Sequence, residues 1–268
     1  MKAFLLAAGM GTRLRPMTET CPKPLIDVAG KPLIVHHIEK LVAAGVVDIV
    51  INLYWLGNLI EQALGDGSQY GATIRYSYEE QLLETGGGLR HAKYLLGTEP
   101  FILVSADVYT EYRFEHLVNH PMGDRLAHLV MVDNPQHKPK GDFTLSTAKA
   151  ETLFPSQDLT QSANAAGESQ ESERGKSENK AQGKNKVQGL LSLLKEGEGY
   201  TYSGISLIHP ALIDLWPSTE KAFPLRDPLV NAVTETRVTG EHCSDLWEDV
   251  GTIERLQCLR DRLAKAHE

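Results

Sequence analysis

Cysteine is scarce in this chain, and positive charge is in deficit. The 268 residues include three cysteines, Cys21, Cys243 and Cys258, and no two of them form a C-x-x-C pair. A disulfide framework and a thiolate zinc site are therefore excluded, and we expect a reducing, cytoplasmic setting.

Acidic residues outnumber lysine and arginine by 35 to 27, so the formal net charge is −8. Such a chain offers no broad surface for nucleic acid, and any phosphate ligand needs cations gathered locally.

Long hydrophobic runs are also missing. The apolar run at residues 3–8 is too short for the core of a signal peptide, and no later segment is long and apolar enough to span a bilayer. The sequence therefore predicts neither secretion nor a membrane partner.

The stretch 156–188 lacks aromatic residues and proline, and its branched aliphatic residues are Leu159 and Val187 alone. It cannot bury enough apolar surface to offset the entropy of ordering. We interpret it as a disordered insertion that interrupts a single domain spanning residues 1–268. Deleting it is expected to leave activity largely intact, because long loops cost little to close or remove.

The rest of the chain alternates between two hydrophobic periods. Short apolar runs predict strands, and apolar residues at helical spacing predict helices between them. The pattern implies crossover connections and an α/β fold, with a mostly parallel mixed sheet flanked by helices. Strands are expected at 4–8, 46–53, 73–77, 101–104 and 200–208, and helices at 33–44, 56–64, 88–96 and 253–264.

The loop at residues 8–24 follows the first strand and is rich in glycine and cations. Gly9 and Gly11 let the backbone approach a phosphate closely, and Arg13 and Lys23 place positive charge beside it. Taken alone, a Gly-x-Gly turn after a strand is more often a plain tight turn. The G-K-[ST] ending of a P-loop is absent, and Leu14 stands where a dinucleotide fingerprint needs its third glycine.

Two further features of the sequence bear on metal binding. Asp107 follows the strand at 101–104, where ligands of open α/β sheets gather, and a carboxylate there suits Mg²⁺. Asp249 by itself is typical of a turn or helix-cap residue. His36 and His37 stand on the first helix without a carboxylate or thiol at ligand spacing, so we expect a helix-surface pair there.

The whole N-terminal string is more specific than its parts. Residues 6–18 read L-A-A-G-M-G-T-R-L-R-P-M-T, and residues 22–24 read P-K-P. This resembles the signature of the sugar-1-phosphate nucleotidyltransferases. The resemblance implies a Rossmann-like nucleotidyltransferase domain that uses a nucleoside triphosphate, a sugar 1-phosphate and Mg²⁺. Asp107 and Asp249 would then be the two ligands of one magnesium ion.

The same resemblance assigns roles around the nucleotide. Arg13 would hold the leaving pyrophosphate and Lys23 would neutralise the transferred phosphoryl group. Residues 83–88, L-E-T-G-G-G, are similar to the base-recognition segment of the family, with Glu79 and Glu80 as acceptors for the base or ribose. The expected nucleotide-binding residues are Ala8, Gly9, Gly11, Thr12, Arg13, Lys23, Glu80, Thr85, Gly86 and Ser105.

Segments 107–110, 132–135, 141–143, 203–206, 209–212 and 247–252 resemble one subfamily, the N-acetylmuramate-1-phosphate uridylyltransferases of bacterial cell-wall recycling. UTP and N-acetylmuramate α-1-phosphate are therefore the expected substrates. Asp142, Ser203 and Gly204 would line the sugar pocket. Arg226 is a candidate partner for the lactyl carboxylate, although an isolated arginine is more often a solvated surface residue. The E-K-P lysine that many relatives use for the sugar phosphate is absent.

Several interpretations stay open on sequence alone. A mannose- or glucose-1-phosphate nucleotidyltransferase using GTP, UTP or dTTP is the main alternative, and a phosphocholine cytidylyltransferase is another. A non-catalytic sugar-nucleotide sensor on the same fold would have lost a metal ligand or the loop lysine. Because Lys23, Asp107 and Asp249 all remain, the sequence favours an enzyme.

Overall fold

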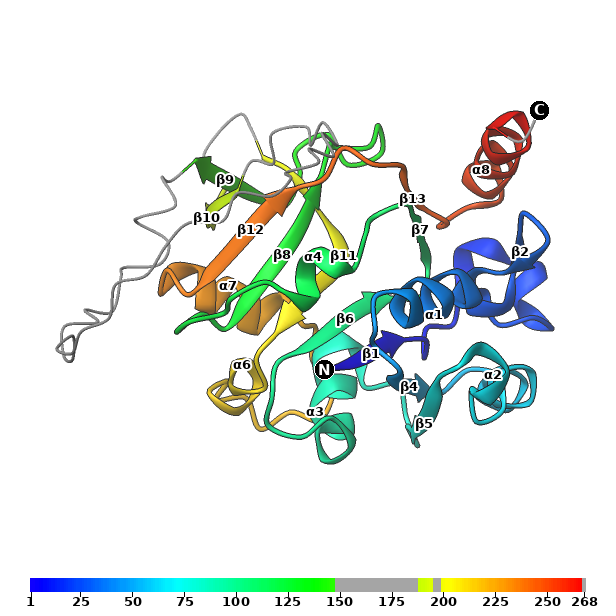
Figure 1. Ribbon diagram of the computed structural model, residues 1–268, viewed down its shortest axis with the longest axis horizontal. Coiled ribbons are helices and arrows are strands. Elements are labelled where there is room, and N and C mark those ends of the chain that lie inside the picture. Colours follow the sequence, from blue (N-terminus) through cyan, green and yellow to red (C-terminus); the bar gives the residue numbers. More distant parts are fainter. Residues whose placement is uncertain (148–187, 195–198, 267–268) are drawn as a thin grey trace, which may run out of the picture.

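A sheet of nine strands organises the chain in the computed structural model, which describes residues 1–147, 188–194 and 199–266. The strand order is β5-β4-β1-β6-β11-β8-β12-β10-β9, and β10 and β11 run against the other seven strands (Figure 1). The predicted α/β fold with a mostly parallel mixed sheet is confirmed. The strands are β1 (Lys2–Leu6), β4 (Asp48–Leu53), β5 (Thr73–Tyr78), β6 (Phe101–Ser105), β8 (Ala127–Val132), β9 (Phe143–Thr147), β10 (Gln188–Leu193), β11 (Thr201–Ile208) and β12 (Val238–His242).

Helices cover both faces of this sheet. On β1, Ala3 and Leu5 face one apolar cluster and Phe4 faces the other, because successive side chains of a strand point to opposite sides. The first cluster takes in α1 (Leu33–Ala43), α2 (Gly57–Leu64) and α4 (Glu115–Val118). The second takes in α3 (Glu84–Leu96), α6 (Ala211–Asp214) and α7 (Arg226–Thr234). A strand buried on both faces is continuously apolar, and that is why its sequence lacks alternation.

The last helix, α8 (Ile253–Ala266), lies beside the N-terminal loop and not on the main sheet (Figure 1). Its buried leucines 256, 259 and 263 pack against Leu14, Ile26 and Val28 in a third apolar cluster. Burying a leucine side chain contributes about 2 kcal/mol. The segment after the first strand is therefore supported by residues from the other end of the chain.

Most expected elements occur within a few residues of their predicted bounds. Two differ in a way that shapes the site. The first strand ends at Leu6 because the next amide, that of Ala7, donates to the side chain of Asn52 over 2.8 Å instead of to a strand. The helix expected at 88–96 begins at Glu84.

The predicted insertion at 156–188 lies outside the described residues, except that Gln188 begins β10. Among the described helices, none has the length and apolar character needed to cross a membrane.

Candidate active site

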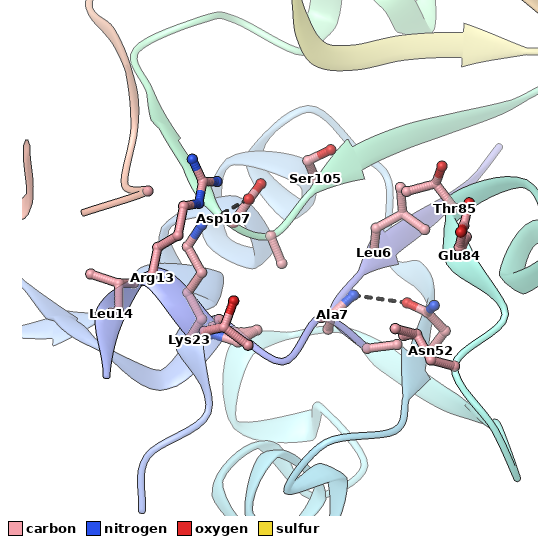
Figure 2. Close-up of a pocket in the computed structure, with 18 residues that line it drawn as sticks. Leu6, Ala7, Arg13, Leu14, Lys23, Asn52, Glu84, Thr85, Ser105 and Asp107 are labelled. Atoms are coloured by element: carbon pink, nitrogen blue, oxygen red, sulfur yellow. Dashed lines mark hydrogen bonds and ion pairs between the residues drawn. The ribbon is translucent and has the colours of Figure 1, made fainter. Parts of the chain in front are cut away.

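A cavity of about 330 Å³ opens at the carboxyl ends of β1, β4 and β6. Parallel strands of open α/β sheets gather ligands at this edge. Figure 2 shows Arg13, Lys23 and Asp107 together at one end, and Asn52, Glu84 and Thr85 at the other. The lining residues are Leu6, Ala7, Ala8, Gly9, Gly11, Thr12, Arg13, Leu14, Lys23, Pro24, Asn52, Leu82, Glu84, Thr85, Ser105, Ala106, Asp107 and Gly251.

The loop after β1 is folded tightly around Gly11. This residue has φ 61°, and the hydroxyl of Thr18 donates to its carbonyl oxygen over 2.8 Å. A Cβ at position 11 would lie 2.9 Å from Thr18 Cγ2 and 3.3 Å from Lys23 Cβ. Glycine is therefore required both by the left-handed backbone and by the lack of space.

Arg13 and Lys23 enter the cavity from two short 3-10 helices, η1 (Thr12–Leu14) and η3 (Lys23–Leu25). Lys23 is buried, and its ammonium lies 2.8 Å from Oδ2 of Asp107. The Asp107 side chain is 44% exposed, and Asp107 lies two residues after the end of β6. A cation and a carboxylate thus meet at the end of the cavity where the glycine-rich loop turns.

Asp249 lies close to Asp107 through backbone pairing. It ends β13 (Trp247–Asp249), which pairs with β7 (Val108–Thr110) so that Asp249 stands opposite Val108. The amide of Val250 also donates to the carbonyl of Asp107 over 3.1 Å. Two aspartates far apart in the chain are thereby brought close to each other.

The donor set at these two aspartates fits Mg²⁺. Oδ1 of Asp249 is buried and has no hydrogen-bond partner among the described residues, and such an oxygen is costly to leave unpaired. No group of three or more metal-ligating side chains occurs in the described part of the chain. Mg²⁺ is often held by proteins through one or two carboxylates, while substrate phosphates and water supply the other ligands.

Glu84 lines the opposite end of the cavity in a strained conformation. Its φ is 59°, in the left-handed region that costs a residue with a Cβ about 1–2 kcal/mol. Strain of this kind clusters at functional sites. The sequence indicated this segment but not this residue, and it gave Asn52 no role, although a polar residue near the end of an apolar strand was a usable signal.

Glu79 does not face the cavity as a base or ribose acceptor, contrary to our expectation. It is buried, accepts from Nδ2 of Asn52 over 2.7 Å, and accepts from the amide of Leu83 over 3.0 Å. Asn52 in turn accepts from the amide of Ala7. The carboxylate therefore connects the segment before α3 to the end of β1.

Glu80 and Gly86 are not among the residues that line this cavity. Glu80 is exposed and lines a neighbouring hollow with Arg90 and His91. The amide of Gly86 donates to the carbonyl of Phe223 over 2.9 Å, and a Cβ there would lie 2.5 Å from the Phe223 ring. Gly86 and Gly87 thus serve close packing against residues 221–223.

The residues expected at the sugar lie around β11. Asp142 pairs with Lys138 over 2.5 Å and accepts from the amide of Tyr202 over 2.9 Å. Ser203 is buried, and its carbonyl accepts from the indole of Trp247 over 2.9 Å.

Gly204 lies on β11 and Arg226 begins α7. A Cβ at Gly204, whose φ is 81°, would lie 2.7 Å from Oγ of Ser105, so glycine lets β11 approach the cavity wall. Arg226 is exposed at the start of α7, next to Leu225, whose amide donates to Thr85 Oγ1 over 2.8 Å.

The two histidines of α1 differ from their predicted surface placement. His37 is 1% exposed, and its Nε2 lies 2.7 Å from the carbonyl of Val108. Burial lowers the pKa of His37 to about 4, so the ring is neutral near pH 7 and Nε2–H is the donor. His36 is half-buried, with Nε2 at 2.8 Å from the carbonyl of Val28. Nε2 of each ring is thus hydrogen-bonded to a backbone carbonyl oxygen.

Comparison with known proteins identifies the class of molecule that this fold and cavity form. A family model described as Nucleotidyl transferase matches residues 2–151, more than half of the chain. The chain therefore belongs to the nucleotidyl transferase family.

Individual relatives extend this result. An N-acetylmuramate alpha-1-phosphate uridylyltransferase from Neisseria meningitidis serogroup B is 39% identical over 269 residues, which cover 96% of each chain. A mannose-1-phosphate guanyltransferase from Hypocrea jecorina is 43% identical over 121 residues, 44% of this chain and 33% of that one. The crystal structure of a UDP-glucose pyrophosphorylase with UDP-glucose superposes with a TM-score of 0.71 at 15% identity, over 99% of this chain and 98% of that one. The last comparison supports the fold alone.

Proposed function

We propose that the protein transfers UMP from UTP to N-acetylmuramate α-1-phosphate, with release of pyrophosphate, in a Mg²⁺-dependent reaction. The observation that carries the proposal is the 39% identity to a uridylyltransferase of this kind along nearly the whole of both chains. The cavity supports it, because Arg13, Lys23 and Asp107 gather at one end, and the polar side chains of Asn52, Glu84 and Thr85 line the other.

The chemistry asks the protein to bring two anions together in line. The sugar phosphate oxygen attacks the α-phosphorus of the triphosphate, and this nucleophile is already ionised, so no general base is needed. Gly9 and Gly11 let the backbone approach the phosphates. Arg13 would hold the leaving pyrophosphate and Lys23 would offset charge on the transferred phosphoryl group.

Magnesium would be held by Asp107 and Asp249. When bound, the ion supplies charge neutralisation for the phosphoryl oxygens and orients them. Side chains of the protein would supply the rest of the charge neutralisation. Lys23, buried beside Asp107, brings its ammonium to the same place, and the low exposure strengthens its electrostatic effect.

The base end is assigned to the segment from Leu82 to Thr85, with Ser105 between the two ends of the cavity. The sugar would lie toward β11, near Asp142, Ser203 and Gly204. Identity to the mannose-1-phosphate guanyltransferase covers less than half of this chain. We therefore favour the uridylyltransferase, whose likeness extends across both ends of the site.

A role in peptidoglycan recycling in the cytoplasm accords with these substrates. The three cysteines form no disulfide, which suits a reducing compartment.

A matrix of substrates tests the proposal. The protein is incubated with Mg²⁺, with each of UTP, GTP, CTP, ATP and dTTP in turn, and with N-acetylmuramate, N-acetylglucosamine, glucose or mannose 1-phosphate, and pyrophosphate is measured. We expect release with UTP and N-acetylmuramate 1-phosphate, at least tenfold above any other pair. Release led by GTP with mannose 1-phosphate would overturn the uridylyltransferase assignment. Absence of release with every pair would point to a non-catalytic sensor.

A further inference from the structure

The two carboxylate oxygens of Asp249 have unlike surroundings. Oδ2 accepts from Nη1 of Arg255 over 2.7 Å, and Nε2 of His137 lies 3.5 Å from the same oxygen. Oδ1 is buried and has no hydrogen-bond partner among the described residues. One oxygen is thus fixed by a cation of the protein, and the other has no partner among the described residues and lies beside Gly251, a residue that lines the cavity.

Arg255 is itself held firmly. It lies in the first turn of α8, and its amide donates to Oγ1 of Thr252 over 3.3 Å. Next to it, Leu256 is 1% exposed and packs in the apolar cluster that also contains Leu14 of the N-terminal loop. The Arg255 side chain is 16% exposed. Its guanidinium is therefore positioned by the same helix that supports the phosphate-binding segment.

Gly251 makes room for this arrangement. A Cβ at position 251 would lie 2.1 Å from Nη2 of Arg255 and 2.8 Å from Oδ1 of Asp249. Its backbone is not left-handed, so the requirement is one of space and not of conformation. The glycine also lines the cavity. Asp249, Gly251 and Arg255 therefore form one structural unit, in which the absence of a side chain lets the guanidinium reach the carboxylate.

We propose that Arg255 is a positioning residue for the magnesium site. By holding Oδ2 of Asp249, it turns Oδ1 toward the metal shared with Asp107 and keeps the carboxylate from rotating. The inference rests on the proposed Mg²⁺ dependence and adds a residue that takes no part in binding either substrate. Partners that hold a ligating carboxylate typically change metal affinity by about 10- to 100-fold when removed.

The test reads metal binding directly. Trp247, two residues before Asp249 on β13, has an indole N–H that Mn²⁺ at Asp249 would broaden in the NMR spectrum, whereas Trp216 near α6 serves as the reference. Mn²⁺ is titrated into wild-type, Arg255→Gln, Arg255→Lys and Arg262→Gln proteins, each with UTP and no sugar phosphate. Arg262 is an exposed arginine two turns further along α8 and is the matched control.

We expect Arg255→Gln to need about 10- to 100-fold more Mn²⁺ for the same broadening, Arg255→Lys to recover part of the loss, and Arg262→Gln to match wild type. At saturating Mg²⁺, the KM for the sugar phosphate should stay within about twofold in Arg255→Gln. The thermal midpoint of each variant shows whether it is folded.

Unchanged Mn²⁺ broadening would overturn the inference. A raised KM with normal metal binding would overturn it as well, because Arg255 would then contact substrate. Failure of the wild-type protein to bind Mn²⁺ with UTP would instead defeat the proposed Mg²⁺ dependence on which the inference rests.

Discussion

The ammonium of Lys23 lies 2.8 Å from Oδ2 of Asp107. The lysine side chain is 8% exposed and the aspartate side chain is 44% exposed. The lysine is therefore shielded from solvent, whereas the aspartate remains accessible from the cavity. Two sequence motifs separated by 84 positions meet in this contact. It places the one buried cation among the described lysines beside the carboxylate proposed to bind metal.

Replacement of Lys23 by methionine should lower kcat by about two to three decades, because a charge aimed at the transferred phosphoryl group is lost. Folding should persist, since Asp107 remains partly in water and no buried charge is left without a partner. Pyrophosphate release measures kcat and circular dichroism measures folding. Lys31→Met, which removes an exposed ion pair with Glu39, is the control and should turn over normally. Near-normal turnover of Lys23→Met would contradict the assigned role.

Gly11→Ala should destabilise the protein and weaken UTP binding. The left-handed backbone costs about 1–2 kcal/mol with a side chain present, and the new Cβ would press on Thr18 Cγ2 at 2.9 Å. Gly30→Ala is a matched control, since Gly30 has φ 83° and a Cβ added there would meet no atom within 4 Å. Both variants should lose unfolding free energy, and calorimetric titration should show reduced UTP affinity in Gly11→Ala alone. Equal affinities would mean that the loop tolerates a side chain.

The variant Glu84→Gly distinguishes the effect of backbone strain at this position from the effect of its carboxylate on nucleotide binding. Glycine accepts φ 59° without penalty, so unfolding free energy should stay the same or rise by up to about 1 kcal/mol. Loss of a carboxylate that contacts the nucleotide should nevertheless raise the KM for UTP about tenfold. Glu80→Gly, measured in parallel, tests the residue that the sequence named instead. If the KM for UTP rises more in Glu80→Gly than in Glu84→Gly, then Glu80 and not Glu84 contacts the nucleotide.

His37 should make stability depend on pH. Burial lowers its pKa from 6.5 to about 4. Below pH 6.5 the unfolded chain takes up a proton that the folded chain refuses until about pH 4, so stability is lost as the pH falls through this window. The loss totals about 3 kcal/mol. Urea unfolding at about pH 7.5 and about pH 4.5 should show a smaller difference for His37→Gln than for wild type, whereas exposed His91→Gln should match wild type.

Periodicity predicted the elements well because their apolar spacing is strong. The buried His37 was missed although its position carried a signal. It stands four residues after Leu33 and four before Leu41, both fully buried, so it lies on the same face of the helix. Our prediction gave more weight to the polarity of histidine than to its position on the apolar face of the helix. The early start of α3 was missed because a run of glycines ordinarily disfavours a helix. Here each glycine is required by a close neighbour: Gly86 by Phe223, Gly87 by the carbonyl of Lys221, and Gly88 by Glu79 and Asn52.

The candidate site was predictable where it lies on contiguous motifs. Among the residues named from the sequence, a group lines one cavity: residues 8, 9 and 11–13, Lys23, Thr85, Ser105 and Asp107. The remainder depends on tertiary contacts that no local pattern contains. Asn52 reaches the site through the sheet, and Arg255 through the packing of α8. Sequence reasoning assigned neither of them.

The packing of α8 has a consequence for how the protein is made. Leu14, Ile26 and Val28 are synthesised well before leucines 256, 259 and 263, which cover them. During synthesis, α8 cannot cover the apolar side of the N-terminal loop until these leucines have been translated. The native packing of that loop therefore depends on a segment made more than two hundred residues later.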